Sequence, residues 1–160
     1  MHPNAALIDS LYAALARRDG GAMAQCYVEE AAFTDPVFDL RGREIGAMWS
    51  MLCMRGKDLR VEWHGVRADA ARGRADWDAH YTFAATGRKV HNRIASEFIF
   101  ADGRILSQHD TFDFRRWARM ALGFSATLPF MTGLVRRAVR RQARRTLDDW
   151  IDTHRGAVSG

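Results

Sequence analysis

Ala32-Phe33-Thr34-Asp35-Pro36-Val37 and Gln108-His109-Asp110-Thr111-Phe112-Asp113-Phe114 each place a carboxylate within an apolar, strand-like run. Side chains alternate between the two faces of a strand, so Asp35 would share its face with Phe33 and Val37. Asp110 would share its face with Phe112 and Phe114 in the same way. A carboxylate that faces a packed interior is costly unless it is paired, hydrogen-bonded or neutral. The two stretches therefore predict an interior site that uses acids, with Asp35 and Asp110 as the candidate catalytic residues.

The residues around these stretches change from helical spacing to a period of two. Apolar spacing, capping residues and glycines predict helices over residues 4–18, 22–30 and 42–55, and a strand over 31–40 that carries Asp35. Alternation then predicts strands over residues 59–68, 74–85, 90–100 and 105–114, joined by short turns. Helices followed by an antiparallel meander predict an α+β fold with the helices on one face of the sheet.

The last part of the chain is basic and helical in pattern. Residues 115–145 hold nine arginines and no acidic residue, and residues 120–135 carry no charge. This uncharged run is shorter than the roughly 20 residues of a membrane-spanning helix. Beyond it, one helix face is apolar, and the opposite face carries Arg136, Arg137, Arg140, Arg141 and Arg144. Such a face is typical of a solvated helix, and it can also contact phosphates or anionic lipid.

Composition limits the class of protein. The chain has 160 residues, 48% of them hydrophobic, which suits a single globular domain with a real core. Cys26 and Cys53 have neither metal-ligand nor redox spacing, so we expect buried free thiols in a reducing cytosol. The N-terminal residues do not have the pattern of a signal peptide, which favours a cytoplasmic location. No groove-reading motif accompanies the arginines, so nucleic-acid binding is not expected.

Over about residues 5–115, the order of elements resembles the nuclear transport factor 2-like superfamily, also called SnoaL-like. Its members are α+β cones, in which N-terminal helices are wrapped by a curved, mostly antiparallel sheet around a deep pocket. Thr34-Asp35-Pro36-Val37 resembles the ketosteroid isomerase motif whose Asp is the general base, and the Gly87-Arg88-Lys89 turn strengthens the match. The resemblance implies a small hydrophobic ligand, catalysis without a cofactor, and Asp35 as the base.

The chain departs from the isomerases at the two oxyanion donors, which are a Tyr and a neutral Asp. Matched on Ala13-Ala14-Leu15, the Tyr position falls on Leu11, and the Asp position falls on Ser96. Tyr12 follows Leu11, and a rotation of about 100° per residue turns it off the expected helix face. We therefore expect little or no steroid isomerisation, and we keep Tyr12 and Ser96 as candidate substrate-binding residues.

A second resemblance is to the limonene-1,2-epoxide hydrolases, whose closing strand carries a run similar to Asp110-Thr111-Phe112-Asp113. Those enzymes also need an Arg-x-Asp, and the matching positions here are Trp77 and Ala79. Arg74-Ala75-Asp76 has the right residues three positions too early, which puts them on the wrong face of a regular strand. We therefore expect the full hydrolase triad to be absent. SnoaL-like polyketide cyclases use a single Asp on the closing strand, and Asp110 is similar to that position.

The isomerase resemblance also implies which residues line the pocket. Trp77, Ala79, Tyr81 and Phe83 would face it, and the aromatic candidates for substrate binding are Trp63, Trp77, Tyr81, Phe98 and Phe112. Core packing alone explains such residues most of the time. The alternatives for the acids are an Asx-turn for Asp35, helix capping or an arginine partner for Asp110, and N-capping for Asp113. His64, His80 and His91 have no recognised metal spacing, so no metal site is expected.

These patterns predict one structural unit with two parts: a cone-shaped α+β domain over residues 1–115 and a basic amphipathic helical extension over 116–160. We expect a homodimer that binds a small hydrophobic molecule. The first functional hypothesis is a cofactor-free isomerase, cyclase or epoxide hydrolase with Asp35 as base and Asp110 as acid. The alternatives are a non-catalytic binding module and a peripheral membrane protein whose arginines contact anionic headgroups.

Overall fold

The computed structural model describes residues 1–123, 128 and 131–155. Three helices and two strands occupy the first third of the chain, and four strands then follow one another. The elements are α1 (Pro3–Ala16), α2 (Gly20–Ala24), β1 (Tyr27–Thr34), β2 (Asp39–Arg41), α3 (Arg43–Arg55), β3 (Arg60–Ala68), β4 (Arg72–Phe83), β5 (Arg88–Ala101), β6 (Arg104–Thr111), α4 (Phe114–Leu122) and α5 (Thr132–Thr153).

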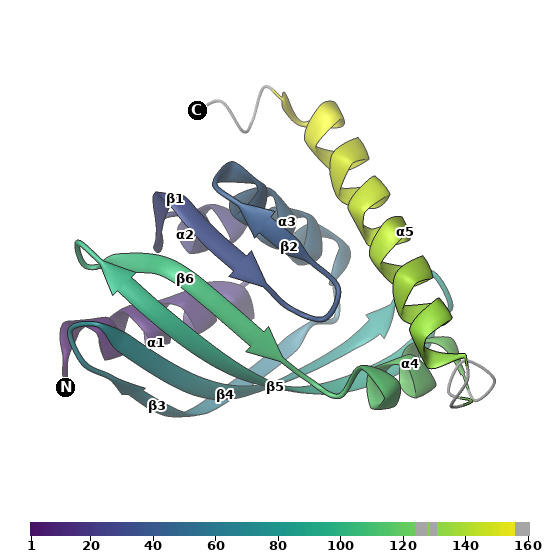
Figure 1. The fold of residues 1–160 in the computed structure, drawn as a ribbon, viewed down its shortest axis with the longest axis horizontal. Coiled ribbons are helices and arrows are strands. Elements are labelled where there is room, and N and C mark those ends of the chain that lie inside the picture. The colour runs from purple at the N-terminus through teal and green to yellow at the C-terminus, as the bar shows by residue number, and fades with distance from the viewer. Residues whose placement is uncertain (124–127, 129–130, 156–160) are drawn as a thin grey trace.

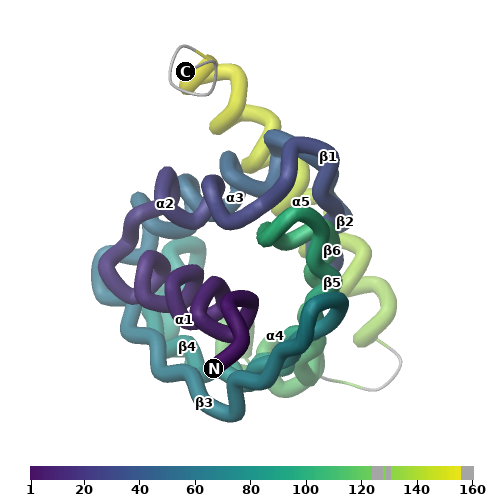
Figure 2. The backbone as a smooth tube through the Cα atoms, turned by 90° about the vertical axis from the view of Figure 1, so that its left-hand side faces the viewer, coloured from purple at the N-terminus to yellow at the C-terminus, as the bar shows by residue number. Residues whose placement is uncertain are grey.

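The six strands form one curved sheet in the order β2-β1-β6-β5-β4-β3 (Figure 1). Neighbouring strands are antiparallel except β1 and β6, which are parallel. Figure 2 shows α1 lying within the curve of this sheet, with α2 and α3 beside it. The structure confirms the predicted α+β cone with a mostly antiparallel sheet and a C-terminal helical extension.

The core lies between α1, α3 and the inner face of the sheet. Ile8, Leu11 and Leu15 recur at intervals of three and four residues along α1, and all three are buried. Tyr12 is also fully buried, so its position one step round the helix still faces the interior. The expectation that rotation turns Tyr12 away is therefore wrong, because the sheet curves round α1 and buries a broad part of its surface.

The predicted second helix over residues 22–30 is wrong in its second half. The carboxylate of Asp19 caps α2 by accepting from the backbone N–H of Ala22 at 2.9 Å, and the helix ends at Ala24. From Tyr27 onward the chain is strand β1, which pairs with β6 up to Thr34. The local run Val28-Glu29-Glu30-Ala31 also fits a helix, and pairing with a distant strand overrides that preference.

The predicted strand over residues 31–40 is interrupted at Asp35. Residues 35–38 form the loop between β1 and β2, which pair as a hairpin with Thr34 opposite Asp39. The side-chain Oδ1 of Asp35 accepts from the backbone N–H groups of Val37 at 2.7 Å and Phe38 at 2.6 Å. The Asx-turn is therefore the observed arrangement, because Pro36 lacks an N–H to donate and the carboxylate organises the turn instead.

The closing strand also ends earlier than predicted, at Thr111, and Phe114 is the first residue of α4. Asp113 caps this helix, since its Oδ1 accepts from the backbone N–H of Arg116 at 3.0 Å. The N-capping alternative for Asp113 is confirmed. Helix α4 packs on the inner surface at the end of β4 and β5, where the indole N–H of Trp117 donates to the hydroxyl of Tyr81 at 2.8 Å.

Helix α5 packs back on the cone along α3 (Figure 1). Its Leu147 is fully buried, and Arg144 pairs with Glu44 of α3. Arg136 donates through Nε to the carbonyl of Pro36 in the β1–β2 loop at 3.3 Å. Two of the five arginines proposed for membrane contact therefore have partners within the chain, while Arg137 and Arg141 are exposed.

The apolar segment that precedes α5 is only partly described. Residues 124–127 and 129–130 of this predicted uncharged run lie outside the described residues. Among the residues that are described, no helix has both the length and the hydrophobicity needed to cross a membrane. Contact of the helical extension with a membrane surface stays a prediction.

Candidate functional site

The buried carboxylate of Asp110 is the centre of the site. Asp110 lies near the end of β6 with 3% of its surface exposed, and Ser96 of β5 is its direct cross-strand partner. The Ser96 hydroxyl donates to Oδ1 of Asp110 at 2.6 Å. Gln108, two residues earlier on the same face, donates through Nε2 to the same oxygen at 2.9 Å. His109 between them is exposed, as the alternation of a strand requires.

Ser96 links the carboxylate to α1 and β4. Its hydroxyl oxygen accepts from the hydroxyl of Tyr12 at 2.7 Å and from the indole N–H of Trp77 at 2.9 Å. A hydroxyl has one hydrogen to donate and two lone pairs to accept with, so these contacts and the bond to Asp110 use all of them. The orientation of the Ser96 hydroxyl is therefore set by its neighbours, with its hydrogen directed at Asp110.

Gln108 links the carboxylate to β1 and α3. Its Oε1 accepts from the hydroxyl of Tyr27 at 2.5 Å, and the Tyr27 oxygen accepts from the indole N–H of Trp49 at 3.0 Å. Among the described residues, every fully buried side-chain nitrogen and oxygen has a hydrogen-bond partner. Side chains from six elements thus form one satisfied polar network inside an apolar core, and such a network holds its members in a defined arrangement.

Burial sets the protonation of this network. Desolvation raises the pKa of Asp110 to about 7, although the hydrogen bonds from Ser96 and Gln108 oppose the rise. Burial also raises the pKa values of Tyr12 and Tyr27 well above their usual range, so both phenols stay protonated and act as donors. Asp110 is consequently the group of this network that gains or loses a proton near neutral pH.

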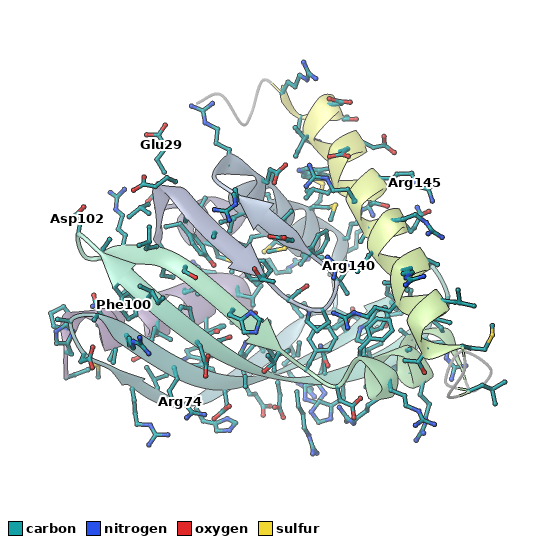
Figure 3. The ribbon with its side chains drawn as sticks, in the orientation of Figure 1. Glu29, Arg74, Phe100, Asp102, Arg140 and Arg145 are labelled. Carbon is teal, nitrogen blue, oxygen red and sulfur yellow. The ribbon has the colours of Figure 1, made fainter. Side chains whose placement is uncertain are left out.

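Asp35 has a different environment at the β1–β2 loop. Desolvation raises its pKa, while the backbone N–H groups of Phe38 and Val37 and the positive charge of Arg140 oppose the rise. Figure 3 shows Arg140 reaching from α5 toward this loop. The negative charge of Asp35 also adds to the raised pKa of Asp110, so the two carboxylates interact. That both line one cavity stays a prediction.

The aromatic residues that were predicted to bind the substrate fall into two groups. Tyr12, Trp77 and Phe98 are buried together, with ring centroids of Tyr12 and Trp77 5.2 Å apart. Trp63 borders this group, and its indole N–H donates to Asp9 of α1 at 3.0 Å. Tyr81 and Phe112 lie where the main core meets a second apolar cluster that is built from α4 and β5. Trp117 therefore covers the part of the interior that holds Tyr81.

Three members of the network were not among the predicted site residues. Tyr27 lies in the segment predicted as a helix over residues 22–30, and Trp49 lies in the helix predicted over residues 42–55. Gln108 could have been found, since it is two residues from Asp110 and therefore shares its face on any regular strand. The pairing of Tyr27 with Gln108 depends on the parallel contact between β1 and β6, which local sequence does not indicate.

Two hollows of the described surface lie outside this network. One is lined by the first turn of α4, including Asp113 and Arg116, and another lies between Arg17 and Lys57. The side chains around Asp110 pack closely, with Tyr12 and Ser96 at most 1% exposed. An open pocket at Asp110 therefore stays a prediction. A ligand can reach Asp110 only if some of these side chains move aside.

Comparisons with known proteins support the cone architecture. The SnoaL-like domain family matches residues 8–108. An LEH-like epoxide hydrolase from M. tuberculosis is 20% identical, with a TM-score of 0.64 over 78% of this chain and 93% of its own. An NTF2-like protein of unknown function from Burkholderia pseudomallei is 18% identical, with a TM-score of 0.66 over 76% and 99%.

A third solved structure has a ketosteroid isomerase-like fold and holds trimethylamine. It comes from Catenulispora acidiphila and is 11% identical, with a TM-score of 0.66 over 77% of this chain and 97% of its own. The comparison with curated proteins gave no match. Identities this low establish the fold alone, whereas the family match covers more than half of the chain. The protein therefore belongs to the SnoaL-like domain family, with the cone fold of the nuclear transport factor 2-like proteins.

Proposed function

We propose that this protein is a cofactor-free enzyme that transfers protons on a small hydrophobic molecule, with Asp110 as the general acid and base. The observation that carries the proposal is the buried carboxyl of Asp110, whose pKa is raised to about 7 while Ser96 and Gln108 hold it in place. A catalytic group works best when its pKa lies near the working pH, because both protonation states are then populated.

The surroundings of Asp110 favour an uncharged substrate. Trp77 and Phe98 are buried beside the network and offer aromatic surface, which suits a hydrophobic ring or chain. As a carboxylate, Asp110 would take a proton from a carbon or from water, and as an acid it would return that proton to carbon or oxygen. Isomerisation, cyclisation and epoxide opening all need such a step. Ser96 would orient the carboxyl, and Tyr12 would hold Ser96.

Asp35 enters the proposal as a second acid with a narrower role. Its Oδ1 is held by two backbone N–H groups, which favours the ionised form and restricts its rotation. It therefore remains a candidate base at the edge of the site. Its charge also contributes to the raised pKa of Asp110, which is a second way to assist the reaction.

A non-catalytic binding module is the second candidate. The observation in its favour is that Trp117 of α4 donates to Tyr81 and that Val135 and Val139 of α5 pack on the same cluster. The extension thus covers one end of the apolar interior, as it would in a protein that encloses a ligand without turning it over. Retention of a ligand without turnover would favour this candidate.

Native mass spectrometry followed by a proton-transfer assay tests the proposal. We expect the purified protein to carry a small hydrophobic molecule, which the mass spectrum shows as added mass. The mass of the intact species in the same spectrum also shows whether the chain is a homodimer. The assay uses a nitrobenzisoxazole, an aromatic probe whose ring opens when a base removes one proton. We expect the native chain to accelerate this opening and Asp110→Asn to lose the acceleration by a factor of about 100 or more.

Asp102→Asn is the matched control, because Asp102 lies at the exposed tip of the β5–β6 hairpin and points away from the body (Figure 3). Its backbone has a positive φ of 53°, which Asn also adopts readily. The control should keep the native rate. Equal rates for the native chain and a folded Asp110→Asn would contradict the proposal, and a bound molecule that no variant transforms would support the binding module instead.

A further inference from the structure

Two histidines and a carboxylate meet on the outer face of the sheet, away from the network just described. His80 of β4 lies directly opposite His91 of β5, and Asp78 is two residues from His80 on the same face. The imidazole rings stack with centroids 4.0 Å apart and planes at 18°. Nε2 of His91 lies 3.0 Å from Oδ2 of Asp78. One ligand atom from each residue lies within 4.8 Å of the other two.

We propose that Asp78, His80 and His91 form a binding site for a divalent first-row transition-metal ion, with Zn²⁺ as the best fit. Neutral imidazole nitrogens and carboxylate oxygens are ligands that Zn²⁺ prefers, at about 2.0–2.2 Å. At tetrahedral angles such bonds place neighbouring ligand atoms roughly 3.4 Å apart. The pair formed by His91 and Asp78 is already close to this spacing, and a side-chain rotation of His80 brings in the third ligand.

The backbone beneath these residues is regular. Strands β4 and β5 pair without interruption from Arg72 opposite Ile99 to Phe83 opposite Arg88. Arg116 of α4 donates through Nη1 to the backbone carbonyl of His91 at 2.8 Å. This hydrogen bond ties the backbone of β5 at His91 to α4. The backbone positions of the three ligands are therefore fixed before the ion arrives, and binding requires only side-chain rotation.

The three side chains are accessible to an ion from solvent. The side chains of His91 and Asp78 are 32% and 28% exposed, so each is partly fixed and partly open. Arg74 lies on the same face of β4, and Figure 3 shows it projecting from the side of the sheet opposite the helices. An ion bound here would keep at least one coordination position for water. The site is separate from Asp110, and the inference does not rest on the proposed function.

Charges near the three residues set the expected strength of binding. Glu62 of β3 and Arg93 of β5 lie opposite Asp78 on its two sides, and Arg60 lies opposite His80. The carboxylate of Glu62 favours a cation, while the two guanidinium groups oppose it. With three protein ligands and these neighbours, we expect micromolar affinity for Zn²⁺.

Calorimetric titration of the full chain with Zn²⁺, after removal of any histidine tag, tests the proposal. We expect the chain to bind one Zn²⁺ near neutral pH. When Co²⁺ replaces Zn²⁺, we expect visible absorption that reports a low coordination number. His80→Ala and His91→Ala should each weaken Zn²⁺ binding by at least about tenfold, and Asp78→Asn should weaken it similarly. His80 contributes only ring stacking to the described contacts, so its variant should fold normally.

His109→Ala is the matched control. His109 is exposed on the outer face of β6 and lies opposite Glu97, so it forms a cross-strand histidine and carboxylate pair without a second histidine. The control should bind Zn²⁺ as the native chain does. The proposal is overturned if Zn²⁺ produces no saturable heat, if His80→Ala and His91→Ala bind as tightly as the native chain, or if His109→Ala alone abolishes binding.

Discussion

Asp110 on the inner face of β6 and Asp35 in the β1–β2 loop are both carboxyls whose pKa is raised by burial. Their hydrogen-bond partners differ. Asp110 accepts from the side chains of Ser96 and Gln108, whereas Asp35 accepts from two backbone N–H groups of its own loop. The same residue type is therefore held by side chains of the sheet in one place and by the backbone of its own loop in the other.

The difference bears on which carboxyl could take part in the proposed chemistry. Asp110 is held by side chains of β5 and β6, so exchanging one of these partners for a substrate atom would leave the backbone hydrogen bonds of the sheet in place. The backbone donors to Asp35 belong to the turn itself, and losing them would open the β1–β2 loop. We infer that Asp110 is primarily a proton-transfer group and that Asp35 is first a structural residue.

The largest expected effect is on the pH dependence of stability, and it comes from Asp110. Its pKa rises from 3.8 in the unfolded chain to about 7 in the folded protein. Between these two values the folded state holds a proton that the unfolded state has lost, so the free energy of unfolding falls as pH rises from about 4 to about 7. Roughly three pKa units at 1.36 kcal/mol each give a decrease on the order of 4 kcal/mol.

Urea unfolding of the native chain and Asp110→Asn across this pH range measures the effect. Asn does not titrate, so the variant should lack this decrease and should gain stability relative to the native chain as pH rises. Other groups titrate equally in both proteins and cancel in the difference. A constant difference in unfolding free energy between pH 4 and pH 7 would show that Asp110 ionises normally.

The second effect concerns the loop. Asp35→Ala removes the acceptor for the N–H groups of Val37 and Phe38, so we expect the free energy of unfolding to fall by about 1–3 kcal/mol. Asp35→Asn keeps a carbonyl oxygen in the same place and should lose much less. Chemical denaturation of both variants measures the two values. Equal losses would mean that the charge of Asp35, rather than its acceptor geometry, supports the loop.

The comparison of the two acids also shows what the sequence could predict. Alternation along a strand placed Asp110 on the inner face, and the run Asp110-Thr111-Phe112-Asp113 located the end of the closing strand within a few residues. The general order of helices and strands followed from periodicity, because each long element buries one face. The isomerase resemblance placed Trp77 inside, and Trp77 is buried.

Local sequence patterns could not predict the contacts between distant segments. The parallel pairing of β1 with β6 brings Tyr27 to Gln108, although the residues after Tyr27 fit a helix. The direct opposition of His80 and His91 depends on the register of β4 and β5, so spacing along the chain did not reveal it. The packing of α5 along α3 likewise joins distant segments, since Arg144 and Glu44 are 100 residues apart in the chain.

A third prediction tests whether the side-chain network holds Asp110. Tyr12→Phe removes one donor to Ser96 while keeping the buried ring, so the free energy of unfolding should fall by about 0.5–1.5 kcal/mol. Ser96 retains its bond from Trp77 and its donation to Asp110. Denaturant unfolding measures the loss. A loss well above this range would show that the network is strongly cooperative, and no loss would show that Ser96 does not need Tyr12.

The smallest effect is the influence of the helical extension on Asp35. The positive charge of Arg140 favours the ionised carboxylate and lowers its pKa, so Arg140→Ala should raise the pKa of Asp35. Carboxyl-carbon NMR signals followed through an acid titration report Asp35 and Asp110 separately. Arg137→Ala is the control, because Arg137 lies on the same helix and is exposed. If Arg140→Ala leaves the titration of Asp35 unchanged, α5 covers the loop without acting on its charge. If the titration shifts upward only in Arg140→Ala, the extension helps to keep Asp35 ionised, and the two acids differ partly because α5 approaches only one of them.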